Sequence, residues 1–494
     1  MIDPPRHVSH YIDGCWTDAE SHEMIPVVDP ATEAELVRVP RATPKEADRA
    51  VRSARAAFDE GSWPQMPPRK RRAIIRDLAD GLRRRRDRIA ATVIAQGGCT
   101  ERQTHGLQVD LAIDMLDRCA ELTADDPVES VVVAGGPFGG TADGLGTTLV
   151  VREPIGVVAA ITPFNFPFFL NAIKVGAALA TGCTVVLKPT EYICLDALHI
   201  AEVLDEETDL PSGAFNLLLG AGGDVGEVLA SHPMVDHVSF TGSTDTGRRV
   251  MGSAAQTIKR LTLELGGKSA NVIFGDADLD RALAGDGALV ISHCGQGCAQ
   301  WTRVVVEDAI HDAVVERMIR RAQTVVIGDP AHPATELGPL VSRAQWERVS
   351  GYIRLGIEEG ATLAYGGSRP PEFDRGFYMA PTIFTDVRNH MRIAQEEIFG
   401  PVVTVQRFRD EEEAIRIAND SIFGLNGAVW SGDLARGLRV ASRIRTGVIN
   451  VNGRGDGGLD YPNGGFKQSG LGREFGVWGV REYTELKAIR YNAL

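Results

Sequence analysis

The most constraining feature of the sequence is the alternation of strand-like and helical segments between residues 149 and 240. Three apolar runs typical of buried strands, Thr184–Lys188, Phe215–Leu219 and Val235–Phe240, are separated by segments in which apolar residues recur at helical spacing. Strands that are almost continuously apolar and alternate with helices are typical of a parallel sheet covered on both faces. This region therefore predicts an α/β fold.

A second α/β series extends from about residue 261 to residue 451. It contains the strand-like runs Val304–Val306 and Val402–Val405 and several amphipathic segments, among them residues 343–359. At 494 residues the chain is too long for one small core, so we expect two or three domains. The Gly- and Asp-rich stretch at 124–146, which holds a short Val strand, predicts a linker or a protruding arm.

Composition excludes several functional classes. Residues 67–96 read as one helix with two runs of basic residues, but the formal net charge of −14 and a pI near 5.4 favour a solvated helix face over a nucleic-acid site. The apolar run Ile155–Ile161 is too short to span a membrane, and the N-terminus lacks the apolar core of a signal peptide. Seven widely spaced cysteines predict reduced thiols in a cytoplasm.

Two glycine-rich loops are candidates for binding a nucleotide. Residues 453–458 match the dinucleotide fingerprint literally, but the residues that follow, up to Gly465, are incompatible with a helix, so we expect a loop at the mouth of a substrate site. Gly242 and Ser243 follow an apolar strand and precede a plausible helix from Arg248, which suits a phosphate near the helix start. A plain strand–turn–helix junction fits this second loop equally well.

Lys188 and Glu191 end the strand that precedes this unit. The carboxyl ends of parallel strands are where ligands bind in open α/β sheets, and a carboxylate there suits ribose hydroxyls and repels an added 2′-phosphate. A surface Lys–Glu pair is the simpler interpretation of these two residues alone.

Three further residues are candidates for one catalytic site. Cys298 lies between Gly297 and Ala299, so a substrate carbon can approach its sulfur, although a single cysteine is by default a buried and inert thiol. Asn165 lies between two prolines and offers an amide to an oxyanion. Glu264 has apolar neighbours, and burial would raise the pKa of its carboxyl toward that of a general base.

Six short motifs in this order resemble the NAD(P)-dependent aldehyde dehydrogenase superfamily, over about residues 11–491. They are Pro163-Phe-Asn-Phe-Pro167, Phe240-Thr-Gly-Ser-Thr244, Leu263-Glu-Leu-Gly-Gly-Lys268, Gly295-Gln-Gly-Cys298, Glu396-Glu-Ile-Phe-Gly-Pro401 and Ser469-Gly-Leu-Gly-Arg-Glu474.

The resemblance implies a role for each matching residue. Cys298 matches the catalytic thiol, Glu264 the general base and Asn165 the oxyanion donor, which acts with the backbone N–H of Cys298. The remaining matches are Lys174 and Glu474 for a proton relay, Lys188 and Glu191 for the adenosine ribose, Gly242 and Ser243 for the pyrophosphate, and Glu397 and Phe399 for the nicotinamide end. No metal is implied.

The implied reaction is the oxidation of an aldehyde to the acid through a thiohemiacetal and a thioester on Cys298, with NAD as the expected cofactor and NADP possible. Glu264 favours hydrolysis over transfer to coenzyme A, because the acylating branch generally lacks this residue. A non-catalytic protein that retains the fold is the other alternative. We expect a hydrophobic or aromatic aldehyde, with a semialdehyde as the alternative, and the expected pocket residues are Phe166, Phe169, Leu170, Ile173, Gly297 and Ala299.

The resemblance also implies an architecture: a Rossmann-like cofactor domain, a second α/β catalytic domain and a small β oligomerisation arm. The expected boundaries are 1–122 and 149–260 for the NAD-binding domain, 261–455 for the thiol domain, 123–148 and 477–494 for the arm and tail, and 456–476 for the mouth loop and return. Open strand edges on the arm should pair across subunits in a homodimer or homotetramer. Cys294 is open to three interpretations, as a packing residue, one of a metal-binding pair, or a protective disulfide partner.

Overall fold

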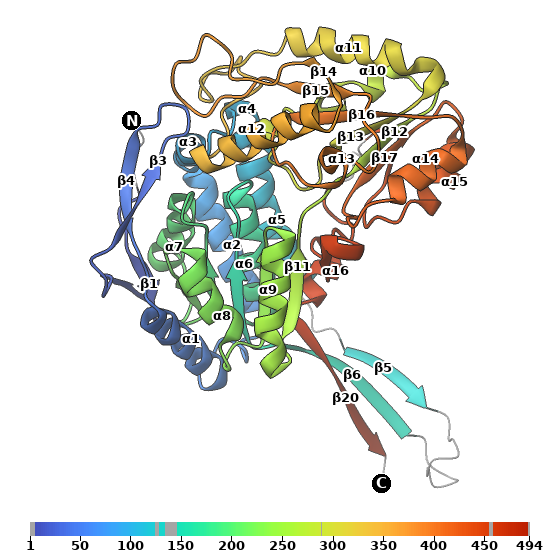
Figure 1. Ribbon diagram of the computed structural model, residues 1–494. Coiled ribbons are helices and arrows are strands. Elements are labelled where there is room, and N and C mark those ends of the chain that lie inside the picture. The colour runs from blue at the N-terminus through green and yellow to red at the C-terminus, as the bar shows by residue number, and fades with distance from the viewer. Residues whose placement is uncertain (1–4, 124–127, 134–145, 288, 454–457, 493–494) are drawn as a thin grey trace.

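The computed structural model describes residues 5–123, 128–133, 146–287, 289–453 and 458–492. Two large sheets covered by helices form the body, and a three-stranded sheet projects away from it (Figure 1). The predicted α/β class is confirmed. Among the described helices, none is both long enough and apolar enough to cross a bilayer.

The first sheet has eight strands, of which the five central ones are parallel. In order across the sheet they are β19 (Gly470–Leu471), β11 (Arg260–Glu264), β10 (His237–Thr241), β7 (Val157–Ile161), β8 (Thr184–Lys188), β9 (Phe215–Leu217), β1 (His10–Ile12) and β2 (Cys15–Thr17). The strands β7, β8 and β10 are buried at every residue, and β7 is apolar throughout, as expected for a parallel strand covered on both faces.

Helices cover both faces of this sheet, as the alternating pattern predicts (Figure 1). One face packs against α2 (Pro68–Arg84), α3 (Arg86–Gly97), α5 (Leu111–Leu122), α6 (Pro167–Thr181) and α7 (Leu195–Glu207). The other face packs against α1 (Pro44–Asp59), α8 (Glu227–Ser231) and α9 (Thr244–Ala254). Helix α6 is buried along its whole length and begins with Pro167, a residue that favours the first helical turn.

The second sheet has seven strands and is parallel except at one edge. Its order is β14 (Thr362–Tyr365), β15 (Thr382–Thr385), β16 (Val402–Phe408), β13 (Arg303–Glu307), β12 (Ala270–Ile273), β17 (Gly427–Trp430) and β18 (Asn450–Val451). Helices α11 (His311–Gln323) and α12 (Arg343–Glu358) cover one face, and α14 (Glu411–Asn419) and α15 (Leu434–Arg443) cover the other. The second series starts later than the pattern predicted, because β11 pairs with β10 in the first sheet.

The projecting sheet consists of β5 (Val128–Val133), β6 (Gly146–Pro154) and β20 (Thr484–Asn492), all antiparallel. Residues 149–161, where the strand-like pattern begins, are therefore shared between two strands in different sheets. Gly156, at φ 134°, separates them, and a Cβ atom there would lie 1.8 Å from Oδ2 of Asp236.

One helical prediction is also corrected. The basic stretch at 67–96 is not one helix, because α2 ends and α3 begins at Arg85, whose guanidinium binds Glu202, Glu206 and Glu207 of α7 at 3.1, 2.6 and 2.8 Å. Ahead of α5, a π-helical segment, η1 (Thr104–Asp110), follows the short α4 (Glu101–Gln103). The literal dinucleotide motif lies largely outside the described residues, and none of the described residues 458–466 is helical.

Candidate active site

The three candidate catalytic residues line one groove between the two sheets. Asn165 follows β7, Glu264 ends β11, and Cys298 lies in the loop before β13. The groove has a volume of about 460 Å³. Residues that are far apart in the sequence therefore meet in one place, as expected for catalytic groups in an α/β enzyme.

The loop before Cys298 has an unusual backbone. The turn His293–Gly295 is left-handed at all three residues, with φ of 46°, 52° and 72°, and a Cβ atom on its glycine would lie 2.0 Å from the carbonyl oxygen of Gly400. Gln296 Nε2 donates to the carbonyl of the first turn residue at 3.0 Å, and Gln300 Nε2 donates to Ser292 O at 2.7 Å. Non-glycine residues in this conformation cost energy and persist only where the surroundings hold them.

The thiol of Cys298 is poorly ionised in this setting. Burial and the negative charges of Glu397 and Glu264 raise its pKa to about 12. A thiol with so high a pKa needs a group that takes its proton before the sulfur becomes nucleophilic.

Glu264 has the properties of such a group. Burial and the neighbouring carboxylate of Glu474 raise the pKa of Glu264 well above its usual range, while Lys174 and Arg473 oppose the rise. Its Oε1 atom is buried without a hydrogen-bond partner among the described residues. An unpaired buried carboxyl oxygen beside a thiol is free to accept a proton from the thiol or from a water molecule.

Asn165 presents its side chain to the groove while its backbone is held from behind. Its carbonyl oxygen accepts a hydrogen bond from Gln108 Nε2 at 3.1 Å, and no described residue accepts from its side-chain amide. Thr162, at the start of the same loop, donates through Oγ1 to Asn171 Oδ1 at 2.6 Å. The amide is thus available to a negative oxygen at the reacting carbon.

Four predicted cofactor residues line the same groove: Gly242, Ser243, Glu397 and Phe399. Ser243 caps α9, because its Oγ accepts from Thr246 N at 3.2 Å, and the helix begins at Thr244, earlier than the sequence suggested. A Cβ atom on Gly242 would lie 2.5 Å from the ring of Phe240, so a larger residue there would require that ring to shift. The start of an 11-residue helix opening into a groove of this size suits a dinucleotide phosphate.

The loop that carries Glu397 and Phe399 is held by α12, which the sequence did not indicate as functional. Arg348 Nη2 donates to Glu397 O at 2.6 Å, and Gln345 Nε2 donates to Phe399 O at 2.7 Å. Glu397 Oε1 accepts from Gly267 N at 2.9 Å, and burial raises the pKa of this carboxyl to about 7. These residues of α12 carried no motif, since an amphipathic helix with polar residues on its outer face is ordinary.

Lys188 and Glu191 form a pair, with Nζ 3.6 Å from Oε2, and neither residue lines the groove segment that holds Cys298. Lys188 is almost fully buried, and this burial lowers the pKa of its ammonium group. Both stand at the carboxyl end of β8, next to β7, as the sequence predicted for that strand.

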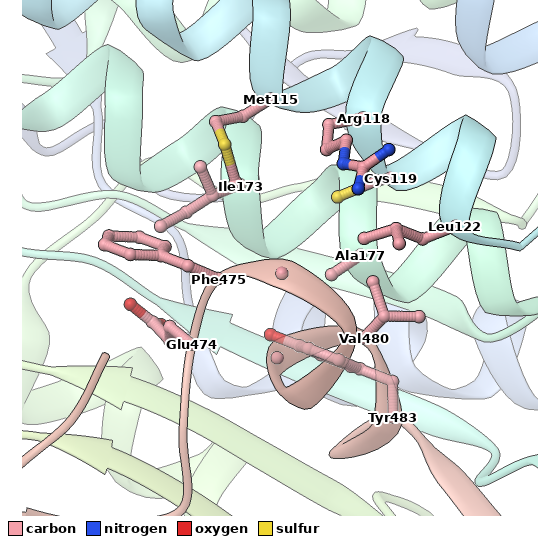
Figure 2. A pocket seen from close by; sticks show the side chains of 12 residues that line it. Met115, Arg118, Cys119, Leu122, Ile173, Ala177, Glu474, Phe475, Val480 and Tyr483 are labelled. Carbon is pink, nitrogen blue, oxygen red and sulfur yellow. The ribbon is translucent and has the colours of Figure 1, made fainter. Parts of the chain in front are cut away.

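Lys174 and Glu474 form a buried ion pair behind the groove. Lys174 Nζ lies 2.5 Å from Glu474 Oε1 and also donates to Ser239 Oγ at 3.0 Å. Glu474 and Tyr483 line one wall of a small cavity of about 20 Å³, across from Met115 and Arg118 on α5 (Figure 2). The pair influences Glu264 through its charges.

The predicted substrate-pocket residues occupy varied positions. Phe169, Leu170 and Ile173 are buried in the core of the first domain, and Ile173 also lines the small cavity of Figure 2. Phe166 is partly buried beside the ring of His293, with 5.8 Å between ring centroids. None of these four lines the groove around Cys298, so their role as a substrate wall stays a prediction.

The residues next to the thiol in the sequence differ in their exposure. Gly297 is buried, and Ala299, like Cys298 itself, is partly exposed. Cys294 is buried and forms no disulfide, which fits a packing role. Among the described residues no cluster of side chains is suited to hold a metal ion.

Comparisons with known proteins agree with this geometry. The family model described as the aldehyde dehydrogenase family matches residues 16–489. The betaine aldehyde dehydrogenase of Bacillus subtilis (strain 168) is 40% identical, covering 98% of this chain and 97% of that protein. The 3-succinoylsemialdehyde-pyridine dehydrogenase of a Pseudomonas species is 41% identical, covering 97% of each chain.

A solved structure of betaine aldehyde dehydrogenase from Staphylococcus aureus in complex with NAD+ superimposes with a TM-score of 0.94 at 36% identity, covering 99% of this chain and 95% of that one. The match in sequence and fold extends over nearly the whole chain and includes the region of the groove with its thiol. This chain belongs to the aldehyde dehydrogenase family.

Proposed function

We propose that this protein oxidises an aldehyde to the carboxylic acid with NAD as the hydride acceptor, and that Cys298 carries the substrate through the reaction. The observation that carries this proposal is the single groove that holds Cys298, Glu264 and Asn165 together with the start of α9. A protein that merely retained the fold would have no need to keep a thiol, a base and an amide in one groove.

The first step follows from the electrostatics of the groove. Because the pKa of Cys298 is about 12, its thiol is protonated at neutral pH, and Glu264 is the neighbouring group suited to take the proton. The sulfur then bonds to the aldehyde carbon. The side-chain amide of Asn165 and the backbone N–H of Cys298 donate to the oxygen that becomes negative.

The groove residues fit a dinucleotide: the start of α9 for the phosphates, and Glu397 with Phe399 near the thiol. NAD bound there would supply the acceptor for the hydride of the substrate carbon. Glu191 stands where a carboxylate would bind ribose hydroxyls and repel a 2′-phosphate. We therefore expect kcat/KM to be clearly higher with NAD than with NADP, and equal values would contradict this role of Glu191.

The thioester left on Cys298 is then hydrolysed by water that Glu264 deprotonates. Glu264 can act twice, first on the thiol and then on water, because burial raises its pKa and makes the carboxylate a stronger base than an exposed glutamate. The presence of this base favours hydrolysis over transfer of the acyl group to coenzyme A. Addition of coenzyme A should therefore leave the product as the free acid.

For the substrate we propose a small aldehyde that bears an amino or trimethylammonium group. Two of the relatives compared above are named for betaine aldehyde. The second candidate is the hydrophobic or aromatic aldehyde expected from the sequence.

The test is the rate of NADH formation with betaine aldehyde, 3-aminopropanal, benzaldehyde and hexanal. We expect the highest kcat/KM for one of the two cationic aldehydes. A preference of tenfold or more for benzaldehyde or hexanal would select the second candidate, and a preference for a carboxylate-bearing semialdehyde would overturn both. No turnover of any aldehyde would overturn the proposed function itself.

Assembly and domain division are proposed on structural grounds. Leu486, Ile489 and Tyr491 on β20 are exposed on the projecting sheet, which supports pairing with further copies in a homodimer or homotetramer. Light scattering that shows a monomer would contradict this.

We retain the expected division into a cofactor domain, a thiol domain and an arm. The seven unpaired cysteines support a reducing compartment such as the cytoplasm.

A further inference from the structure

Two glutamines on one segment each bond to the backbone of a different active-site loop. Gln103 Oε1 accepts from the backbone N–H of His293, in the loop of the thiol, at 2.8 Å. Gln108 Nε2 donates to the backbone carbonyl of Asn165 at 3.1 Å. We propose that the segment Glu101–Asp110 is a clamp in which Gln103 and Gln108 set the position of the thiol relative to the oxyanion donor. This inference rests on the proposed function of Cys298 and Asn165.

The winding of the segment explains how both side chains serve one site. Gln103 ends α4, and Gln108 lies in the π-helical η1. In an α-helix, residues five apart point about 140° away from each other, because each residue turns the helix by about 100°. The wider turn of a π-helix brings residues five apart closer to the same side than an α-helix does. Both side chains accordingly reach the same thiol: Cys99 Sγ donates to Gln103 Oε1 at 3.5 Å and lies 4.0 Å from Gln108 Nε2.

The segment is also tied to both halves of the molecule. The backbone N–H of Glu101 donates to Pro330 O at 2.8 Å, in the half that carries the thiol. Its other end continues into α5, which packs in the core of the first domain. The clamp therefore spans the junction across which Cys298 and Asn165 face each other.

On the thiol side, the clamp supports a strained turn. His293 begins the left-handed turn that leads to Cys298, and its N–H points to Gln103 rather than to another backbone group. Removal of this acceptor leaves the N–H unpaired next to a backbone conformation that is already unfavourable. We expect the loop to shift, and with it the sulfur.

On the oxyanion side, the clamp is fully buried. Gln108 has no exposed surface, and its amide bonds directly to the residue whose side chain is the proposed oxyanion donor. A displacement of about 1 Å of such a group can cost about a hundredfold in rate. Gln108 and Gln103 touch neither substrate nor cofactor, so they are positioning residues.

Substitution of Gln108 gives the sharper experiment. Gln108→Glu keeps the shape of the side chain, but an ionised carboxylate cannot donate to Asn165 O, whereas a protonated carboxyl can. Burial raises the pKa of such a carboxyl, and the neighbouring Cys99, whose pKa is raised to about 11 by burial, stays neutral. We expect the pre-steady-state rate of NADH formation to fall at least about tenfold at pH 8 and to recover, relative to wild type, as the pH falls toward 6.

Gln108→Ala should lose the same rate without any such recovery, and Gln323→Glu, on the exposed end of α11, should follow wild type at every pH. NAD affinity, measured by fluorescence titration, should change less than about threefold in the Gln108 variants. A purely structural role would lower the melting temperature and NAD affinity together and would give Gln108→Glu and Gln108→Ala the same flat pH profile, which would overturn the proposal.

Gln103 is tested by rescue. Gln103→Leu removes the acceptor for His293 N–H, while Gln103→Glu retains an acceptor on a side chain that is only partly buried. We expect Gln103→Leu to slow the alkylation of Cys298 by iodoacetamide at least about fivefold, as followed by mass spectrometry of the Cys298 peptide, and Gln103→Glu to recover most of that loss. Equal alkylation rates in Gln103→Leu and wild type would overturn the clamp on this side.

The alkylation assay needs no aldehyde turnover, so it separates the two levels of inference. A wild-type protein that oxidises no aldehyde defeats the proposed function, whereas altered thiol reactivity in Gln103→Leu still reports on the clamp. If Gln103→Leu does not fold, Gln103→Met provides the same loss of acceptor with a flexible apolar side chain.

Discussion

The two parallel sheets supply the active site from opposite ends. In the eight-stranded sheet the functional groups come after the strands, with Asn165 beyond β7, Ser243 beyond β10 and Glu264 at the end of β11. In the seven-stranded sheet they come before the strands, with Cys298 ahead of β13 and Glu397 ahead of β16. The first sheet thus follows the general rule for ligand sites in open α/β sheets, and the second does not.

The connection between the sheets explains the difference. The chain leaves β11 at Glu264 and enters β12 at Ala270, so the carboxyl edge of the first sheet faces the amino edge of the second. Gly267, within this connection, lies so close to the thiol loop that a Cβ atom there would be 2.3 Å from the carbonyl oxygen of Cys298. In the proposed mechanism, the first sheet therefore supplies the base, the amide and the phosphate site, and the second supplies the nucleophile.

The largest expected effect comes from removing the thiol of Cys298, which the second sheet supplies. Cys298→Ala leaves the groove and its cofactor residues in place, so we expect NAD to bind as in wild type while aldehyde oxidation falls by at least about 10⁴-fold. The measurements are NADH absorbance and NAD titration by fluorescence. Oxidation that survives in this variant would mean that another group carries the substrate.

The second test removes the base that the first sheet supplies. Glu264→Gln keeps the shape of the side chain but cannot accept a proton, so the thioester should accumulate, with steady-state turnover about a hundredfold to ten-thousandfold lower. Mass spectrometry should find the acyl group on the Cys298 peptide. Unchanged turnover would show that Glu264 is not the base, and a loss without acyl accumulation would show that proton transfer from the thiol, rather than from water, limits the variant.

The third test concerns the buried pair behind the first sheet. Lys174→Met leaves the carboxylate of Glu474 buried without its partner, which should lower the free energy of unfolding by about 3 to 5 kcal/mol. Lys45→Met breaks the exposed pair with Glu20 and should cost less than about 1 kcal/mol. Urea unfolding measures both changes. Equal losses of unfolding free energy would contradict the larger contribution to stability that is expected of the buried pair.

The smallest expected effect concerns the influence of the Glu397 charge on the thiol of Cys298. Among charged groups, Glu397 contributes most to the raised pKa of Cys298, and the pKa of Glu397 itself is about 7. Glu397→Gln removes its negative charge, which wild type carries only above about pH 7, so the thiol pKa should fall. Alkylation of Cys298 should therefore be a few-fold faster in the variant, and the ratio to wild type should rise as the pH passes upward through 7. A ratio that does not change with pH would contradict this coupling.

The α/β class and the three proposed catalytic residues could be identified from the sequence. Buried parallel strands favour apolar residues, as in the whole of β7 and the centre of β8, so an apolar run of this length predicts a strand of the sheet. Cys298, Glu264 and Asn165 were accessible because each lies in a short motif of small, apolar or proline neighbours. The structure places all three in one groove, as those motifs predicted.

Other features depend on contacts between residues distant in the chain, and no local pattern contains them. The helix break at Arg85 reflects carboxylates on α7, and the division of the stretch before Ile161 reflects pairing of β6 with β20 at the far end of the chain. In the sequence, Gln103 and Gln108 are ordinary polar residues of a helical segment. Only the structure shows that each bonds to the backbone of an active-site loop. The sequence specifies which groups are present and which elements they occupy, whereas packing between distant elements decides which of those groups act together, because hydrogen bonds and charges act over a few ångströms of space rather than along the chain.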